Sequence, residues 1–281
     1  MAFAKANLNY AKEYSQALAQ AYPYTLYFGA LWSATKPDVK FLNNNTVILP
    51  SLTVKGRSNG DRDTIGSFAR NFNNAEESKT LKTHRTWNTL VHPRDIDETN
   101  HVASIQNITK VMNEEQKFPE MDAEMITALY SLKNALEAVS EDDVLTAANV
   151  LTKFDKMMDK MDEKRVPGSG RLLYVDTYTK TLIDTAKDVV RTSGNSVLGR
   201  TVSRIDEVEV INVPTSVMKS KFNLKADDGF EVAADAKAVK MMLIHPSVVI
   251  PVITYDFAEL GLPSALSQGK YTYFEESFED V

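Results

Sequence analysis

Apolar residues recur at helical spacing through the middle of the chain. One series runs from Val102 to Met112 and a second from Met121 to Leu136, with steps of three and four residues in each. This spacing places each series along one side of a helix. We therefore predict two consecutive helices, the first capped by Asp97 or Thr99 and the second beginning after a break at Pro119.

Two further stretches predict helices. The stretch 140–165 opens with Ser140 as a cap, continues with three acidic residues and closes with Lys164-Arg165, which suits the negative end of a helix. A shorter helix is expected after Asp176, again a capping residue. Methionines at helical spacing are typical of core filling, and we assign that role to Met157, Met158 and Met161.

Clusters of β-branched and aromatic residues predict strands. The clearest early strand is 46–54, where Pro50 suggests an edge position, and a second is 83–91. Later strands are expected at 171–175, 202–213, 241–244, 254–260 and 270–274. The polar stretches 68–81 and 219–237 are interpreted as irregular or loop-like.

The two early strands bracket a long polar stretch, so we expect them to form an extended hairpin whose tip has no core of its own. Residues 51–94 hold eight Lys/Arg and four Asp/Glu, a local charge of +4 in a chain of net charge -6. Opposite charges on hairpin and body favour pairing between copies. A solvated loop with a charge bias is the other interpretation.

The two ends of the chain have distinct patterns. Residues 1–22 predict an amphipathic helix, with Tyr14 and Leu18 on its apolar side, that docks on its own body or on a neighbour. The aromatic stretch 22–28 is expected to be part of an extended arm. Near the C-terminus, Glu275-Glu276 and Glu279-Asp280 are expected to form a solvated acidic end.

Composition narrows the class of protein. The 281 residues are 43% hydrophobic and 25% charged, ordinary values for a globular chain with a substantial core. There is no cysteine, which excludes disulfides and thiolate chemistry. No apolar run approaches the roughly 20 residues of a membrane span. We expect no signal peptide, because the first residues lack a basic segment followed by an apolar one.

Motifs for catalysis or cofactor binding were not found. The four histidines have no metal-ligand spacing, and the chain contains no HExxH, GxSxG, Walker A or GxGxxG motif. Gly168-Ser-Gly170 follows a helix rather than a strand, the wrong context for a phosphate loop. The acidic groups Asp97-Glu98 and Glu141–Asp143 are explained as capping residues at helix starts. We therefore assign no catalytic, cofactor-binding or metal-ligating residue, and we expect no enzyme activity.

Five segments, in their order and spacing, resemble a known family: 97–101, 119–123, 165–175, 205–214 and 273–281. The chain resembles the tailed-bacteriophage major capsid proteins with the HK97-type fold, and in particular those of phages of Gram-positive bacteria. The resemblance implies an α+β fold. It also implies these divisions: an N-arm at 1–45, an extended loop at 46–94, a peripheral domain at 95–170 with a spine helix at about 119–139, an axial domain at 171–251, and C-terminal strands at 252–281 that return to the peripheral domain.

The resemblance also implies a function and partners. The chain would assemble with itself, as pentamers and hexamers, into the icosahedral shell of a virion in the host cytoplasm. A separate scaffolding protein, a portal, decoration proteins and packaged double-stranded DNA, bound without sequence specificity, would be its other partners. The residues expected at contacts between subunits are Arg57, Arg62, Arg70, Lys79, Lys82, Tyr14 and Leu18. Three alternatives stay open: an encapsulin-like compartment shell, a motif-poor two-domain enzyme, and an adaptor or tail structural protein.

Overall fold

The computed structural model describes residues 24–33, 40–43, 46–57, 59, 70–99, 104–133, 142–186, 204–205, 208–226 and 229–281. The helix predicted over 1–22, including Tyr14 and Leu18, lies outside these residues. Arg62 and the predicted cap Ser140 lie outside them as well.

Helices and strands alternate without a simple repeat. The helices are α1 (Gly29–Trp32), α2 (Pro93–Glu98), α3 (Ile105–Met112), the π-helical turn η1 (Asn113–Lys117), α4 (Phe118–Leu132), α5 (Val150–Glu163), α6 (Thr177–Ala186) and the 3-10 helix η4 (Pro246–Val248). The strands are β1 (Lys40–Asn43), β2 (Thr46–Val54), β3 (Phe72–Thr80), β4 (His84–Val91), β5 (Leu172–Asp176), β6 (Arg204–Ile205), β7 (Val208–Val213), β8 (Phe222–Leu224), β9 (Phe230–Val232), β10 (Met241–Ile244), β11 (Val252–Gly261) and β12 (Tyr271–Asp280).

A four-stranded sheet in the order β10-β5-β7-β6 carries the core on both of its faces. In β5, Leu172 and Tyr174 belong to the cluster that includes Met125 and Leu129 of α4, whereas Leu173 and Val175 belong to the cluster of α5 and α6. Successive strand residues point to opposite faces, so a strand covered on both sides reads as a continuous apolar run. This explains why β5 was predictable. The predicted cap Asp176 at the start of α6 and the predicted strands around it are confirmed.

The two central helices form one run without a break. α3, η1 and α4 follow one another from Ile105 to Leu132, so the predicted interruption at Pro119 is wrong. Proline removes a backbone donor and crowds the preceding turn, and a π-helical turn is wider than an α-helical one. Pro119 lies two residues after that turn, as the second residue of α4. The predicted cap is also corrected, since Ser104 accepts from the Asn107 backbone N–H at the start of α3.

α5 begins at Val150, ten residues later than predicted. Polar side chains hold the preceding segment in turns: Asn149 accepts from the Thr146 N–H at 2.7 Å and donates to the Val144 carbonyl at 3.0 Å. Such local bonds give the backbone an alternative to the helix. Within α5, Met157 and Met158 pack against the core, as predicted.

The early hairpin has a different second strand from the one predicted. β2 pairs in antiparallel register with β3, from Thr46 opposite Thr80 to Val54 opposite Phe72. We had interpreted this second strand as irregular because it is almost entirely polar. β1 pairs with β2 only as far as Ile48, so Pro50 lies where β2 has a single neighbour, which fits its predicted edge position. We call the β2–β3 pair beyond residue 50 the ribbon.

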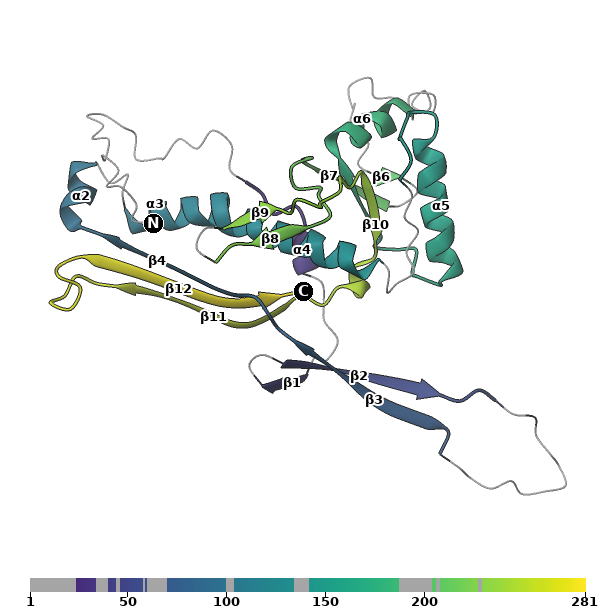
Figure 1. Ribbon diagram of the computed structural model, residues 1–281, viewed down its shortest axis with the longest axis horizontal. Coiled ribbons are helices and arrows are strands. Elements are labelled where there is room, and N and C mark those ends of the chain that lie inside the picture. Colours follow the sequence, from purple (N-terminus) through teal and green to yellow (C-terminus); the bar gives the residue numbers. More distant parts are fainter. Residues whose placement is uncertain are drawn as a thin grey trace.

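β4, the strand predicted to close the hairpin, pairs instead with the last strand of the chain, β12, in the sheet β11-β12-β4. The stretch 219–237, predicted as loop, contains the small β8-β9 hairpin. Figure 1 shows the resulting shape: α5 and α6 cover one end, α2, α3 and the β11–β12 hairpin reach the other, and the ribbon extends away from both.

Candidate inter-subunit surfaces

The ribbon is exposed on both of its faces. Every described side chain from Ser51 to Arg57 and from Arg70 to Phe72 is exposed. Neither hydrophobic core cluster includes a residue of the ribbon. An isolated pair of strands is marginally stable in water, because it has no sheet or helix to pack on. A ribbon of this kind gains burial when another surface covers it.

One face of the ribbon is apolar. Val54 lies opposite Phe72, and Leu52 is two residues from Val54, so the three share a face. Their exposed fractions are 65% for Leu52, 70% for Val54 and 52% for Phe72. The Arg70 guanidinium lies 4.7 Å from the centre of the Phe72 ring, next to this face. We call these four residues the ribbon face.

The predicted basic residues divide into two groups. Arg57, Arg70, Lys79 and Lys82 have exposed side chains on or beside the ribbon. Two other members of the basic count bind acids of their own chain: Arg85 donates to Glu120 at 2.6 and 3.0 Å, and Arg94 to Glu98 at 2.5 Å. Residues 51–82 then carry six Lys/Arg against four Asp/Glu, so the ribbon charge is +2 rather than +4.

Two of the four C-terminal acids, Glu275 and Glu279, are buried, so their prediction as part of a solvated end is wrong, whereas Glu276 and Asp280 are partly exposed. Glu275 and Glu279 of β12 are 7% and 9% exposed and both form ion pairs with Lys117 of η1. Burial lowers the pKa of Lys117, but the Glu275 and Glu279 carboxylates outweigh it and hold that pKa above its usual value. The sheet is therefore joined to the long helix by charged side chains.

A third acid at this junction, Glu124, has an unusually high pKa. The Glu124 carboxylate of α4 accepts a hydrogen bond from the Thr83 hydroxyl. Burial raises the pKa of Glu124 to about 7, and the negative charges of Asp280, Glu279 and Glu120 act in the same direction. Glu124 thus changes charge near neutral pH.

Asp122 holds the segment that enters the body from the N-terminal side. Its carboxylate is fully buried and accepts from the Tyr24 hydroxyl at 2.7 Å, the Tyr27 N–H at 2.9 Å and the Phe28 N–H at 3.0 Å. Phe28 and Leu31 of this segment are fully buried in the core. The prediction of an extended arm is therefore wrong for Phe28, and sequence analysis did not identify this role of Asp122.

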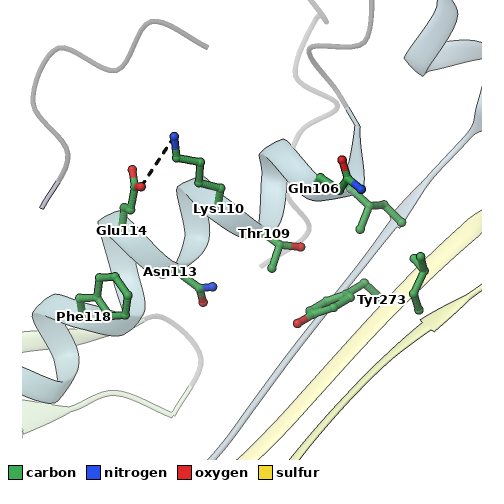
Figure 2. Close-up of a pocket in the computed structure, with 9 residues that line it drawn as sticks. Gln106, Thr109, Lys110, Asn113, Glu114, Phe118 and Tyr273 are labelled. Atoms are coloured by element: carbon green, nitrogen blue, oxygen red, sulfur yellow. Dashed lines mark ion pairs between the residues drawn. The ribbon is translucent and has the colours of Figure 1, made fainter. Parts of the chain in front are cut away.

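A groove of about 500 Å³ lies between the long helix and the sheet. Gln106, Thr109 and Asn113 line it from the helix, and Leu260 and Tyr273 line it from β11 and β12. Figure 2 shows Thr109 and Asn113 pointing from the helix towards the sheet, whereas Lys110 and Glu114 point away and form an ion pair of 3.9 Å. Sequence analysis did not identify this groove, because its two walls are about 150 residues apart in the chain.

The acidic groups that we had explained as capping residues have other roles. Asp97 and Glu98 lie in the last turn of α2, and Asp143 pairs with Lys153 ahead of α5. In the described part of the chain, no cluster of His, Asp and Glu side chains could hold a metal ion. The helices described there are also too short or too polar to cross a membrane.

Comparisons with known proteins find likeness in structure only. No protein-family model and no curated protein matches the chain. The capsid of cyanophage P-SCSP1u aligns with a TM-score of 0.62 at 10% identity, over 96% of this chain and 88% of that chain. The capsid of Ralstonia phage GP4 aligns with a TM-score of 0.57 at 10% identity, over 99% and 92%. The mature capsid of bacteriophage PhiM1 aligns with a TM-score of 0.54 at 13% identity, over 84% and 78%.

At such identities the likeness is one of fold. It agrees with the mixed α and β capsid architecture expected from the sequence, whereas the division into domains stays a prediction.

Proposed function

We propose that this chain, which has the fold of tailed-phage capsid proteins, is a major capsid protein of the HK97 type. Its role is structural and not enzymatic: copies assemble into the icosahedral shell that encloses the double-stranded DNA genome of a tailed phage. The shell is the virion capsid, built in the host cytoplasm. Subunits contact one another through the N-arm and the extended loop.

The observation that carries this proposal is the ribbon. Leu52, Val54 and Phe72 form an exposed apolar face on two strands that pack on neither core cluster. In an isolated monomer this face would stay in contact with water, which is unfavourable. Exposed apolar patches of this kind mark interaction surfaces. Copies of the same chain satisfy the requirement by symmetry, and many weak contacts repeated in this way close a shell.

The divisions of the chain follow from the same proposal. The N-arm is 1–45, although Tyr24 to Ser33 pack on the body and only the remainder is available to a neighbour. The extended loop is 46–94, the peripheral domain 95–170, the axial domain 171–251, and 252–281 returns to the peripheral domain. Pairing of β12 with β4 and the Lys117 ion pairs support this return.

The partners that we propose are the chain itself in pentamers and hexamers, a scaffolding protein, a portal, decoration proteins and packaged DNA. Electron microscopy of the purified chain, expressed alone and with a scaffolding partner, tests the assignment. Closed icosahedral shells are expected in one of the two samples. Shells that hold cargo protein instead of DNA in the native host indicate a compartment shell, rings or tubes indicate a tail or adaptor protein, and small discrete oligomers in both samples contradict the proposal.

A further inference from the structure

Three residues join the sheet that carries the ribbon to the sheet of the body. β3 ends at Thr80, which pairs with Thr46 of β2, and β4 begins at His84, which pairs with Phe278 of β12. The residues between them, 81–83, belong to neither sheet. We call these residues the linker. Their backbone angles help to set the direction of the ribbon relative to the body.

Acidic side chains of the body hold the linker. The Lys82 N–H donates to the Asp280 carboxylate of β12 at 2.7 Å. The Thr83 hydroxyl donates to the Glu124 carboxylate of α4. Two of the three linker residues are therefore bound to acids, and these two acids come from different elements. A carboxylate in such a position fixes a backbone direction that no regular strand pairing fixes.

The first two residues of β4 are held in the same way. His84 Nε2 lies 2.7 Å from the Glu276 carboxylate, and Arg85 donates to the Glu120 carboxylate at 2.6 and 3.0 Å. Four consecutive residues, 82–85, thus each bind a different acid of the body. We call these acids the clamp; they are Glu120 and Glu124 of α4 and Glu276 and Asp280 of β12.

The clamp brings several negative charges close together. Burial raises the pKa of Glu124 to about 7, the negative charges of Asp280, Glu279 and Glu120 raise it further, and the hydrogen bond from Thr83 opposes the rise. The other charged or titratable groups of the elements that meet there are Lys117 of η1, Lys82 of the linker, His84 and Arg85 of β4, Glu275 and Glu276 of β12, and Lys225 and Glu231 of the β8–β9 hairpin.

We propose that the linker is a hinge controlled by protons. At acidic pH the clamp holds the ribbon in the direction that Figure 1 shows, and at alkaline pH repulsion among the deprotonated acids releases it. The hinge is a property of the single subunit, so this inference goes beyond the proposed function and does not depend on shell assembly.

Proton binding differs between the closed and the open clamp. A Glu124 side chain released into water has a pKa near the ordinary 4.5, so the closed state binds the proton more tightly. Closure gains this advantage in full below about pH 4.5 and loses it as the pH rises through about 7. His84 acts in the same direction, because its contact with Glu276 becomes an ion pair only when the imidazole is protonated.

Distances between spin labels on the unassembled full-length chain test the hinge. The chain has no cysteine, so labels attach only to introduced thiols. Asn73→Cys places a label on β3 and Thr152→Cys places one on α5, and both positions are exposed. Double electron–electron resonance should give a narrow distance distribution at pH 5 and a second, broader population at pH 8. The ratio of closed to open molecules should fall about tenfold between the two pH values.

A pair of labels within the body provides the control. Gln106→Cys on α3 combined with Thr152→Cys on α5 uses two exposed positions outside the ribbon. This pair should give the same distance distribution at pH 5 and pH 8.

Two variants of the clamp should have opposite effects. Glu124→Gln keeps an acceptor for Thr83 and carries no charge, so the ribbon distribution should stay narrow at pH 8. Thr83→Val removes the hydroxyl that binds Glu124, so the second population should be present already at pH 5. Glu115→Gln removes an exposed acid of η1 outside the clamp and should respond to pH as the wild type does.

The outcomes bear on the hinge alone. Ribbon distributions that are identical at pH 5 and pH 8 in the wild type overturn the inference. A pH response that persists in Glu124→Gln, or that Glu115→Gln abolishes equally, also overturns it, because the clamp would then not be the group that senses the proton. Whether shells form is a separate measurement, so the hinge can fail while the capsid assignment stands, and the reverse.

Discussion

At the scale of single residues, Asp122 has a structural role that sequence analysis did not foresee. Its carboxylate is buried and three donors of the segment 24–28 converge on it. Burial raises its pKa and the three hydrogen bonds oppose that rise. The bonds thus keep an acid in the core and hold the root of the proposed N-arm in place.

Asp122→Asn should release this segment. The amide retains one acceptor but turns an N–H₂ group towards donors, so the free energy of unfolding should fall by about 3 kcal/mol. Tyr24→Phe removes a single hydrogen bond and should lower it by about 1 kcal/mol. Urea unfolding measures both losses, and limited proteolysis should cut near Tyr27 faster in the first variant. Equal losses would show that the three bonds do not act together.

Glu124 predicts a dependence on pH. Its pKa is raised from 4.5 to about 7, so the folded chain retains a proton that the unfolded chain has released. The stabilisation is full below about pH 4.5 and is lost as the pH rises towards 7. Glu124→Gln keeps the acceptor for Thr83 and removes the charge. This variant should be more stable than wild type by about 2 kcal/mol at pH 8, after solvent screening, and nearly equal to it at about pH 4, below the unfolded pKa. Unfolding of unassembled subunits at the two pH values provides the check, and a constant difference would contradict the assignment.

At the scale of elements, β3 and the long helix show where local pattern is insufficient. β3 is almost entirely polar because both faces of the ribbon meet solvent, so it has no alternation of burial to reveal it. The long helix continues past Pro119 because a π-helical turn precedes the ring. Neither feature follows from the periodicity of apolar residues: β3 forms by pairing with β2, and the helix continues because the π-helical turn precedes Pro119.

The ribbon should be dispensable for folding and necessary for assembly. Residues 52–74 can be replaced by Asn-Gly, which joins the directly paired Ser51 and Ala75 through a tight turn. Because the removed residues contribute nothing to either core cluster, the free energy of unfolding should change by less than about 1 kcal/mol. No shells should form. Circular dichroism and sedimentation velocity measure the two properties, and shells from the shortened chain would contradict the role of the ribbon.

At the scale of the whole molecule, shape and charge act together. The body holds its two cores on opposite faces of the sheet around β5, while the ribbon, the β11–β12 hairpin and the long helix reach outwards (Figure 1). A rigid body with outward extensions is what repeated assembly requires, because each extension gains burial only on another copy.

Charge reversal on the ribbon should weaken assembly without unfolding the subunit. The triple variant Arg57→Glu, Arg62→Glu and Arg70→Glu changes the ribbon charge from +2 to -4. Repulsion between an acidic ribbon and an acidic body should abolish shells at low salt, and added salt should restore part of the yield by screening. Light scattering over a salt series measures the yield, with thermal unfolding of the subunit as the control. Normal yield at low salt would contradict an electrostatic role.

Some elements were set by the sequence alone. β5 and β10 are apolar runs, β2 is rich in β-branched residues, α6 begins after its capping acid, and the apolar stripe of α4 places Met125 and Leu129 in the core. These depend on propensity and periodicity, which act over a few residues. The β2 strand that begins the ribbon and the exposure of Arg57 and Arg70 were also predictable from local sequence.

Partners distant in sequence were decided by the tertiary structure. It paired β4 with β12 instead of β2, buried Glu275 and Glu279 against Lys117, turned Asp122 into the anchor of residues 24–28, and formed the groove at Thr109 and Asn113. Arg85 likewise pairs with Glu120, 35 residues away, instead of contributing to an exposed basic surface. A strand does not encode its neighbour in its own pattern, and a charged side chain does not encode whether it will be buried. Both depend on which distant segments the fold brings together.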